Sequence, residues 1–185
     1  ASLLALLPFI DYIDTNNPIF IDAKSGVSGA GKNPSDTTHY CQINDNVHAY
    51  NPFKHRHMPE IQEKVKILKG KELPINFVPH LLPLTRGMLV SVFATLKEDI
   101  DVNKVLEDAY KDCEFVRLRN KPVDVKSVAG TNFCDLFVTK NGNALFVSSA
   151  IDNLLRGASS QAVVNANIIC GYEEYEGIPK IAYVP

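Results

Sequence analysis

The sequence predicts an α+β fold, in which helices cover a mixed, mainly antiparallel sheet. Residues 133–138 and 144–148 are two β-rich runs that flank Lys-Asn-Gly-Asn at 140–143. An Asn-Gly pair between such runs is a strong hairpin signal. Most other predicted strands are also joined by hairpins or short turns, and the helices fall between these groups of strands. This order favours antiparallel or mixed pairing under a helical layer.

The first half of the chain supplies two helices and up to three strands. Residues 1–13 repeat apolar side chains at helical spacing, and Pro8 predicts a kink or a first-turn position. Residues 57–69 form an amphipathic helix with Pro59 in its first turn. Between them we expect a buried strand at 19–21, a Ser-Gly-rich loop at 24–32 and a strand or hairpin at 40–51.

The second half continues the pattern. We expect strands at 75–78, 87–96 and 114–118, a helix at 102–110, and the hairpin described above. A final helix spans about 151–169, with a cap near Asp152, an end at Gly171 and one side of small residues. An irregular tail covers 172–185.

Composition excludes several classes of protein. The 185 residues are 45% hydrophobic and 22% charged, with a net charge of -2, so nothing indicates nucleic acid or an anionic membrane as a partner. The longest apolar stretch is far short of the ~20 residues that span a bilayer. Four cysteines without a C-x-x-C pair indicate reduced thiols in a cytoplasmic protein. The chain starts inside a helical apolar run without an initiator Met, and we expect it to be part of a longer protein.

A histidine and a carboxylate provide the first candidate for chemistry. His57 and Glu60 are three residues apart at a helix start and therefore share one face. The carboxylate can orient the imidazole for proton transfer, and incidental histidines on a solvated helix start are the alternative. A metal site is a further alternative, but His55 and His57 have no obvious third ligand.

Three other segments hold candidate binding residues. The glycines of the 24–32 loop allow close approach of a ligand to the backbone, although the loop matches neither phosphate-binding fingerprint. Arg86 lies in a polar turn between two strands, where it can bind a carboxylate or phosphate or can be a plain surface arginine. Asp152 is a candidate helix cap.

Together these segments resemble the N-acetyl-gamma-glutamyl-phosphate reductases. The similar runs are residues 21–31 (Ile-Asp-Ala-Lys-Ser-Gly-Val-Ser-Gly-Ala-Gly), 55–61 (His-Arg-His-Met-Pro-Glu-Ile), 77–81 with 86–87, and 152–154 with 161–163. They occur in the family's order and extend to about Gly171. The related aspartate-semialdehyde dehydrogenases share the Ser-Gly-Ala-Gly loop, but we do not expect the histidine run in them.

The resemblance implies a mechanism and a set of roles. A cysteine thiolate attacks the acyl phosphate and expels phosphate, and the resulting thioester accepts hydride from NADPH, in arginine biosynthesis. The family's acid/base group would be His57, with Glu60 as its orienting partner. The substrate-binding residues would be Arg86, Lys24 and Ser25. The cofactor-binding residues would be Ser28, Gly29, Gly31 and Asn153, and no metal is implied.

The sequence departs from the family in what precedes Ala1. The family's cysteine lies in a Gly-Cys-Tyr-Pro-Thr-like motif just before the helix at 1–13, and its dinucleotide-binding domain lies before that motif. We therefore expect residues 1–150 to be a catalytic and dimerisation domain like the C-terminal domain of glyceraldehyde-3-phosphate-dehydrogenase-like enzymes. We expect residues 151–185 to pack on the dinucleotide-binding domain. Alone, the chain would be inactive, with a homo-oligomeric contact through its sheet. The alternatives are a non-enzymatic binding or assembly module and an enzyme of the aspartate-semialdehyde type.

Overall fold

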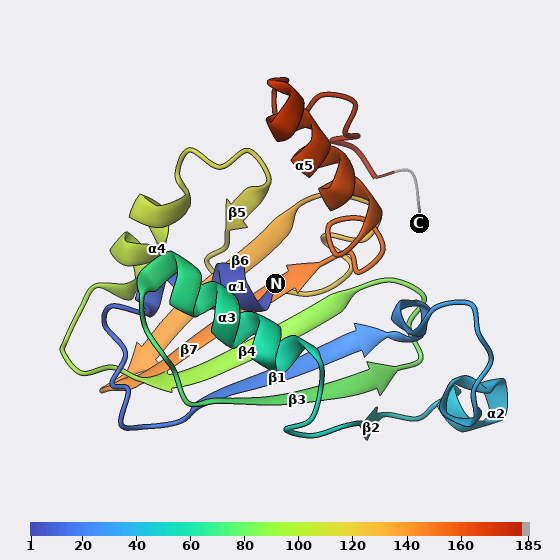
Figure 1. The fold of residues 1–185 in the computed structure, drawn as a ribbon, viewed down its shortest axis with the longest axis horizontal. Helices are drawn as coiled ribbons and strands as arrows, with labels where there is room; N and C mark the ends of the chain where they lie inside the picture. The colour runs from blue at the N-terminus through green and yellow to red at the C-terminus, as the bar shows by residue number, and fades with distance from the viewer. Residues whose placement is uncertain (183–185) are drawn as a thin grey trace.

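One mixed sheet forms the body of residues 1–182, the part of the chain that the computed structural model describes (Figure 1). Its seven strands lie in the order β2-β3-β1-β4-β7-β6-β5. The strands are β1 (Ile19–Gly26), β2 (His48–Ala49), β3 (Ile75–Leu82), β4 (Met88–Thr95), β5 (Val116–Leu118), β6 (Cys134–Asn141) and β7 (Ala144–Ile151). The helices are α1 (Ser2–Leu6), α2 (Tyr40–Ile43), α3 (His57–Lys69), α4 (Val102–Tyr110) and α5 (Ser159–Cys170).

The sheet is mixed and mainly antiparallel, which confirms the predicted fold class. Strand β1 pairs in parallel with β3, and β5 pairs in parallel with β6. The other four neighbouring pairs are antiparallel, including the β6–β7 hairpin at Asn141–Ala144. A parallel pair requires a long crossover, and α3 lies within the connection from β1 to β3.

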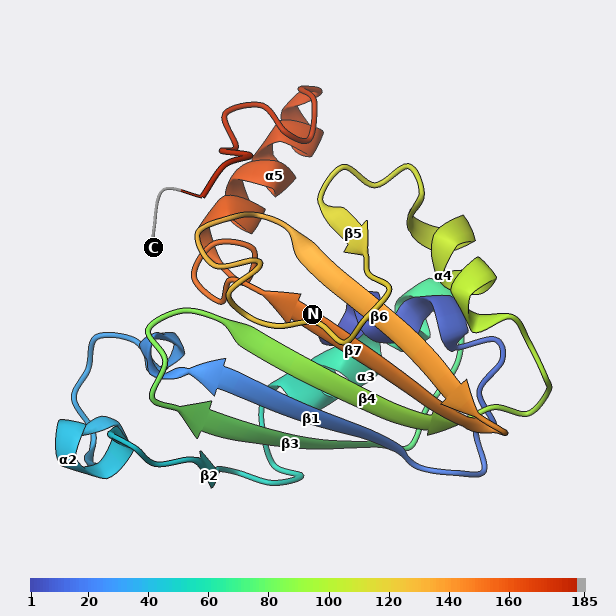
Figure 2. The same cartoon turned by 180° about the vertical axis from the view of Figure 1, so that it is seen from behind.

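The two faces of the sheet are different. Along β1, Ile19, Ile21 and Ala23 are buried, whereas Phe20 is 48% exposed and Asp22 is half-buried. Because side chains alternate between faces along a strand, one face packs under α1, α3 and α4 and forms the core. Turned by 180°, the molecule shows the other face with no helix in front of the central strands (Figure 2).

Two helices have the predicted bounds. Helix α3 buries Ile61 and Val65 and ends where Gly70 adopts a left-handed conformation, in which glycine has no Cβ penalty. Helix α4 starts after Asp101, whose carboxylate accepts hydrogen bonds from the backbone N–H groups of Asn103 and Lys104, both at 3.1 Å. These local signals were sufficient to position both helices.

The first helix is shorter than predicted. Helix α1 ends at Leu6, and a single 3₁₀ turn over Leu7–Phe9 follows it. Pro8 has no N–H, so it cannot donate to the carbonyl of Leu4, four residues earlier. The hydroxyl of Tyr110 donates to that carbonyl instead, at 2.7 Å.

Three further predictions were wrong in their bounds. The expected strand or hairpin at 40–51 is the short helix α2 followed by β2, because Asp45 adopts a left-handed conformation and turns the chain. Strand β1 continues to Gly26, so the loop begins later than predicted. The final helix begins at Ser159 instead of 151, after a turn that Asp152 caps. The last three residues of the predicted tail, 183–185, lie outside the described residues.

Candidate active site

His57 is the first residue of α3, and its half-buried ring lies beside other aromatic rings on the covered side of the sheet. The His55 ring is 4.6 Å from it, centroid to centroid, and the Phe77 ring is 6.5 Å from it. Helix α1 contacts α3 on this side of the sheet.

The surroundings of His57 favour its neutral form. Burial lowers the pKa of the imidazole, the Glu60 carboxylate opposes this change, and Arg56 adds to it. Among residues 1–182, no hydrogen bond or ion pair joins the His57 ring to Glu60, which is exposed on the first turn of α3. The two residues interact through their charges, and the orienting role of Glu60 stays a prediction.

A second group of residues joins three loops by hydrogen bonds. The side-chain oxygen of Asn153 accepts a hydrogen bond from the Gly87 N–H at 2.8 Å, and its amide nitrogen donates to Ser28 Oγ at 2.9 Å. The Ser28 hydroxyl in turn donates to the carbonyl of Thr85. The structure thus brings together Ser28 and Asn153, which lie 125 positions apart in the sequence.

Asp152 holds Arg86 in place beside this network. The Arg86 guanidinium donates to Asp152 Oδ2 at 3.0 Å, and the N–H of Gly130 donates to the same oxygen at 2.8 Å. Oδ1 accepts the N–H groups of Leu154 and Leu155 at 2.8 and 2.9 Å. Burial alone would raise the pKa of this carboxyl, but these donors hold the pKa below its usual value.

The Ser-Gly-rich loop packs closely against the same network. A Cβ on Gly29 would lie 3.1 Å from Ser25 Oγ and 3.4 Å from the side-chain nitrogen of Asn153, so glycine allows this approach. Gly31 has a φ of 83°, a left-handed conformation. A cleft of about 390 Å³ opens beside the loop; its lining includes Ser28, Gly31 and Thr85.

Lys24 does not join the other predicted site residues. It precedes Ser25 in β1, and neighbouring residues in a strand point to opposite faces. Its ammonium group pairs with Asp22 on the open face, and His80 Nδ1 lies 3.0 Å from the other oxygen of Asp22. The structure therefore separates Lys24 from Ser25, Arg86 and His57.

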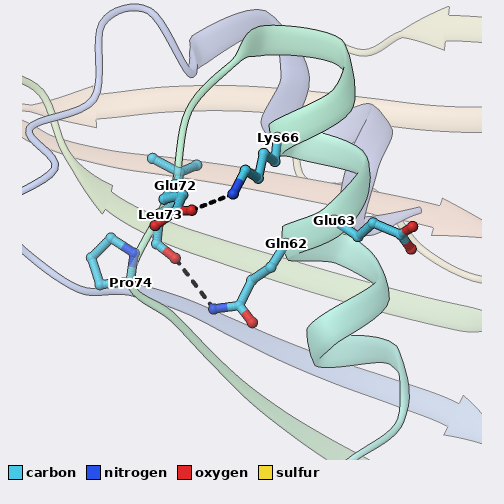
Figure 3. A pocket seen from close by; sticks show the side chains of 6 residues that line it. All are labelled: Gln62, Glu63, Lys66, Glu72, Leu73 and Pro74. Atoms are coloured by element: carbon cyan, nitrogen blue, oxygen red, sulfur yellow. Dashed lines mark hydrogen bonds and ion pairs between the residues drawn. The ribbon is translucent and has the colours of Figure 1, made fainter.

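A second cleft, of about 460 Å³, lies beside the second half of α3 (Figure 3). A 2.6 Å ion pair between Lys66 and Glu72 crosses it, and Gln62 donates to the Leu73 carbonyl at 3.4 Å. None of the predicted site residues lines it. Gln62, Lys66 and Glu72 are engaged in these contacts, and no histidine or cysteine lines the cleft, so it offers no chemistry comparable to that around His57.

Sequence reasoning missed several residues of the site. Tyr50 and His55 pack around His57, and Thr85 and Gly87 anchor the Ser28–Asn153 network through backbone atoms. The Thr85 carbonyl and the Gly87 N–H are backbone groups, which no side-chain pattern in the sequence can indicate. The only signal for the anchor at Gly87 was its place next to Arg86 in the sequence. The histidine pair was a detectable signal for His55, which we considered only as a metal ligand.

The described residues contain neither a candidate metal cluster nor a membrane-spanning helix. Within residues 1–182, no three His, Cys, Asp or Glu side chains are grouped so that they could hold a metal ion. In the same part of the chain, no helix has the length and apolar character needed to cross a membrane.

Comparison with known proteins places this site in a family. Residues 1–153 match the family model described as semialdehyde dehydrogenase, dimerisation domain. The chain is 64% identical over its full length to N-acetyl-gamma-glutamyl-phosphate reductase from Sulfurovum sp. and 55% identical to the protein of that name from Wolinella succinogenes. It covers 55% of each relative, so it spans about half the length of the curated proteins that it matches.

Solved structures share the fold. Aspartate semialdehyde dehydrogenase II from Vibrio cholerae superposes with a TM-score of 0.72 at 19% identity, over 92% of this chain and 59% of that chain. A probable aspartate-semialdehyde dehydrogenase from Pseudomonas aeruginosa gives 0.71 at 17% identity, over 90% and 58%. At this identity the likeness concerns the fold alone.

Proposed function

The chain belongs to the semialdehyde dehydrogenase dimerisation-domain family, and from this premise we propose that the protein carrying it is an N-acetyl-gamma-glutamyl-phosphate reductase. It would reduce N-acetyl-gamma-glutamyl phosphate to N-acetylglutamate semialdehyde with NADPH, in arginine biosynthesis in the cytoplasm. The identity of 50–64% to five reductases of that name, over nearly the whole chain, supports this choice over the aspartate enzymes.

One observation carries the proposed chemistry: α1 contacts α3, whose first residue is His57, and burial lowers the pKa of this imidazole, which favours its neutral form. The resemblance puts the nucleophilic cysteine just before α1. A neutral imidazole beside that point can accept the thiol proton and return it to a leaving group, and such a base typically contributes ~10²–10⁴ in rate. Glu60 would stabilise the imidazolium that forms, through the charge interaction described above.

The substrate side of the site would consist of Arg86 and Ser25. Asp152 fixes the Arg86 guanidinium with one hydrogen bond, and part of this side chain stays exposed to bind a carboxylate or phosphate. Lys24 lies on the opposite face of the sheet, so we assign it to the subunit contact instead.

The cofactor side would be the wall made by Ser28, Gly29, Gly31 and Asn153. This wall fits a flat ring: Gly29 has no side chain to fill the space against Ser25, and a cleft opens beside Gly31. Asn153 has both ends of its amide engaged, by Gly87 and Ser28, and therefore shapes the wall. NADPH, when bound, would supply the hydride.

Two surfaces would receive partners. The open face of the sheet exposes Phe20 and Phe93, at 48% and 47%, and would form the contact with a second copy of the chain. Helix α5 buries little more than Ser160, Val164 and Asn167. Its exposed residues, which include Ile168 and Ile169, would pack on the dinucleotide-binding domain.

The test is a reductase assay of a full-length protein that contains this chain. We expect NADPH-dependent turnover of N-acetyl-gamma-glutamyl phosphate, and we expect His57→Asn to lower kcat by ~10²–10⁴ with little change in the Kd for NADPH. His39→Asn, at an exposed histidine, is the matched control and should leave kcat unchanged. Near-normal turnover in His57→Asn would reject the role of His57. Preference for aspartyl phosphate would favour the aspartate enzyme, and no turnover of either substrate would favour a binding module.

A further inference from the structure

His55 caps the first turn of α3 with both its side chain and its backbone. The first N–H groups of a helix have no partner within the helix. The N-cap residue, Arg56, provides no side-chain acceptor. Instead, the N–H of His57 donates to Nδ1 of His55 at 3.2 Å, and the N–H of Met58 donates to the His55 carbonyl at 3.0 Å.

This hydrogen bond fixes the protonation of His55. An imidazole nitrogen that accepts a hydrogen bond carries a lone pair, so the proton of neutral His55 must lie on Nε2. An imidazolium has protons on both nitrogens and cannot accept from the His57 N–H. Burial lowers the pKa of His55, and the neighbouring His57 and Arg56 add to this effect, which agrees with the neutral tautomer.

Aromatic rings hold His55 on the other sides. Its ring lies 5.4 Å from that of Tyr50 at 74°, and 5.4 Å from that of Phe77 at 35°. Phe77 is buried in the sheet, so its ring is a rigid surface against which His55 packs. The His57 ring meets the edge of the same group, 4.6 Å from His55 at 70°.

The backbone before His55 is bent in an unusual way to reach this position. Asn51 and Phe53 have φ values of 44° and 60°, a left-handed conformation that is uncommon for residues other than glycine. The N–H of Phe53 donates to the Phe77 carbonyl at 3.0 Å, which ties this bend to β3. A bulky residue in this conformation persists only where the surrounding structure imposes it, and such strain concentrates at functional sites.

We propose that His55 is a positioning residue: as the neutral Nε2–H tautomer, it caps α3 and holds the His57 ring in the orientation required for proton transfer. This inference rests on the proposed acid/base role of His57. His55 acts through His57, whose backbone it binds and whose ring it contacts.

The charged and titratable groups around this pair define the response to pH. Those around the two imidazoles are Arg56, Glu60 and Tyr50. Protonation of His55 would remove the acceptor for the His57 N–H and place a positive charge beside His57. Both effects oppose the action of His57 as a base, so the acidic limb of a kcat/KM profile should depend on two protons.

Three variants in the full-length protein test the positioning role. His55→Phe keeps an aromatic ring but removes the acceptor, and we expect kcat to fall at least 10-fold while KM stays within 2-fold. His55→Asn places an amide oxygen near the position of Nδ1 and should restore kcat to within 3-fold of the wild type, with a one-proton acidic limb. His39→Phe is the matched control at an exposed histidine, with unchanged kcat expected.

Nitrogen NMR of the wild-type chain provides a test that needs neither activity nor a variant. We expect His55 to show a lone pair on Nδ1 and a proton on Nε2 at neutral pH. A proton on Nδ1 would overturn the proposal. Normal kcat in His55→Phe, together with impaired His57→Asn, would overturn the positioning role and leave the proposed function intact. Normal turnover in His57→Asn would reject the acid/base role of His57, and with it the positioning role of His55, while turnover of the substrate by the wild type decides the proposed function separately.

Discussion

Two aspartates beside basic side chains, one fully buried and one half-buried, show how differently this sheet uses a carboxylate. Asp152 is 0% exposed and accepts hydrogen bonds from Arg86 and from three backbone N–H groups within the described residues. The side chain of Asp22 is 35% exposed and faces Lys24 and His80. Asp22 Oδ1 lies 3.0 Å from His80 Nδ1, yet neither atom has a partner in hydrogen-bonding geometry among the described residues.

The difference indicates what each aspartate does. A fully bonded buried carboxylate connects segments of the chain rigidly, here the turn at Arg86, the loop at Gly130 and the start of the 152–158 turn. A half-bonded carboxylate on an open face retains capacity for a further donor. We therefore expect Asp152 to determine stability and Asp22 to affect association.

The largest expected effect is that of Asp152→Asn. Asparagine has no negative charge and only one acceptor oxygen. If that oxygen keeps the N–H groups of Leu154 and Leu155, the amide nitrogen replaces Oδ2, and both Arg86 and Gly130 lose their acceptor. Breaking a buried pair in this way typically costs about 3–5 kcal/mol of unfolding free energy. Urea unfolding of the two proteins measures this difference.

Asp108→Asn is a suitable control for that measurement. Asp108 forms an exposed pair with Lys104 at 3.3 Å on α4. Such i,i+4 pairs contribute ~0.3–0.5 kcal/mol. Equal losses in Asp108→Asn and Asp152→Asn would contradict the contrast between a buried and an exposed carboxylate.

At acidic pH, the difference in unfolding free energy between the wild type and Asp152→Asn should become smaller. The folded-state pKa of Asp152 is depressed, so its stabilising contribution is present above the unfolded value of ~3.9 and is lost as pH falls through the folded pKa. We expect a constant difference in unfolding free energy between pH 5 and 7 and a shrinking one below about pH 4. If the difference in unfolding free energy grew as the pH fell, the lowered pKa of Asp152 would be contradicted.

Asn153→Ala should have a smaller effect than Asp152→Asn. It leaves the buried N–H of Gly87 without its acceptor, and an unsatisfied buried donor costs about 1–3 kcal/mol. It also frees Ser28. Thermal unfolding should show a lower Tm, and hydrogen exchange should be faster at Gly87. Unchanged exchange there would mean that Asn153 is not the anchor of this turn.

Asp22→Asn should have the smallest effect on the unfolding free energy of the monomer. Partly exposed ion pairs contribute about 0–1 kcal/mol. On the proposed subunit face, however, the substitution leaves Lys24 without its counter-charge, so sedimentation should show weaker self-association. A loss of stability as large as that of Asp152→Asn, with unchanged association, would remove the distinction between the two aspartates.

Much of the fold was predictable because local signals specified it. The apolar stripe of α3, the turn residue Gly70 and the Asn-Gly pair of the β6–β7 hairpin each act within a few residues. The sheet class followed from the short connections. The histidine run, the Ser-Gly-rich loop and the Arg86 turn were also recognisable as separate candidate segments.

What could not be predicted depends on distant contacts. No local pattern shows that Tyr110 donates to Leu4, or that Asn153 links Ser28 to Gly87, because these pairs form only after folding. The resemblance assigns both Lys24 and Ser25 to the substrate, and no local pattern in the expected loop shows that the two side chains point apart. Once β1 continues to Gly26, the alternation of a strand turns Lys24 away from Ser25.

The position of β1 also bears on the kinetics of folding. Strands β3 and β4 follow each other in the sequence, yet β1 lies between them and pairs with both. Strands β3 and β4 therefore cannot pair with each other as a hairpin. Each pairs instead with β1, which lies more than fifty residues earlier in the sequence. Non-local pairings of this kind slow folding. During synthesis, β1 is made before β3 and β4, so it has no strand partner until they follow. The sheet can therefore form correctly only if β1 makes no other stable pairing in the meantime.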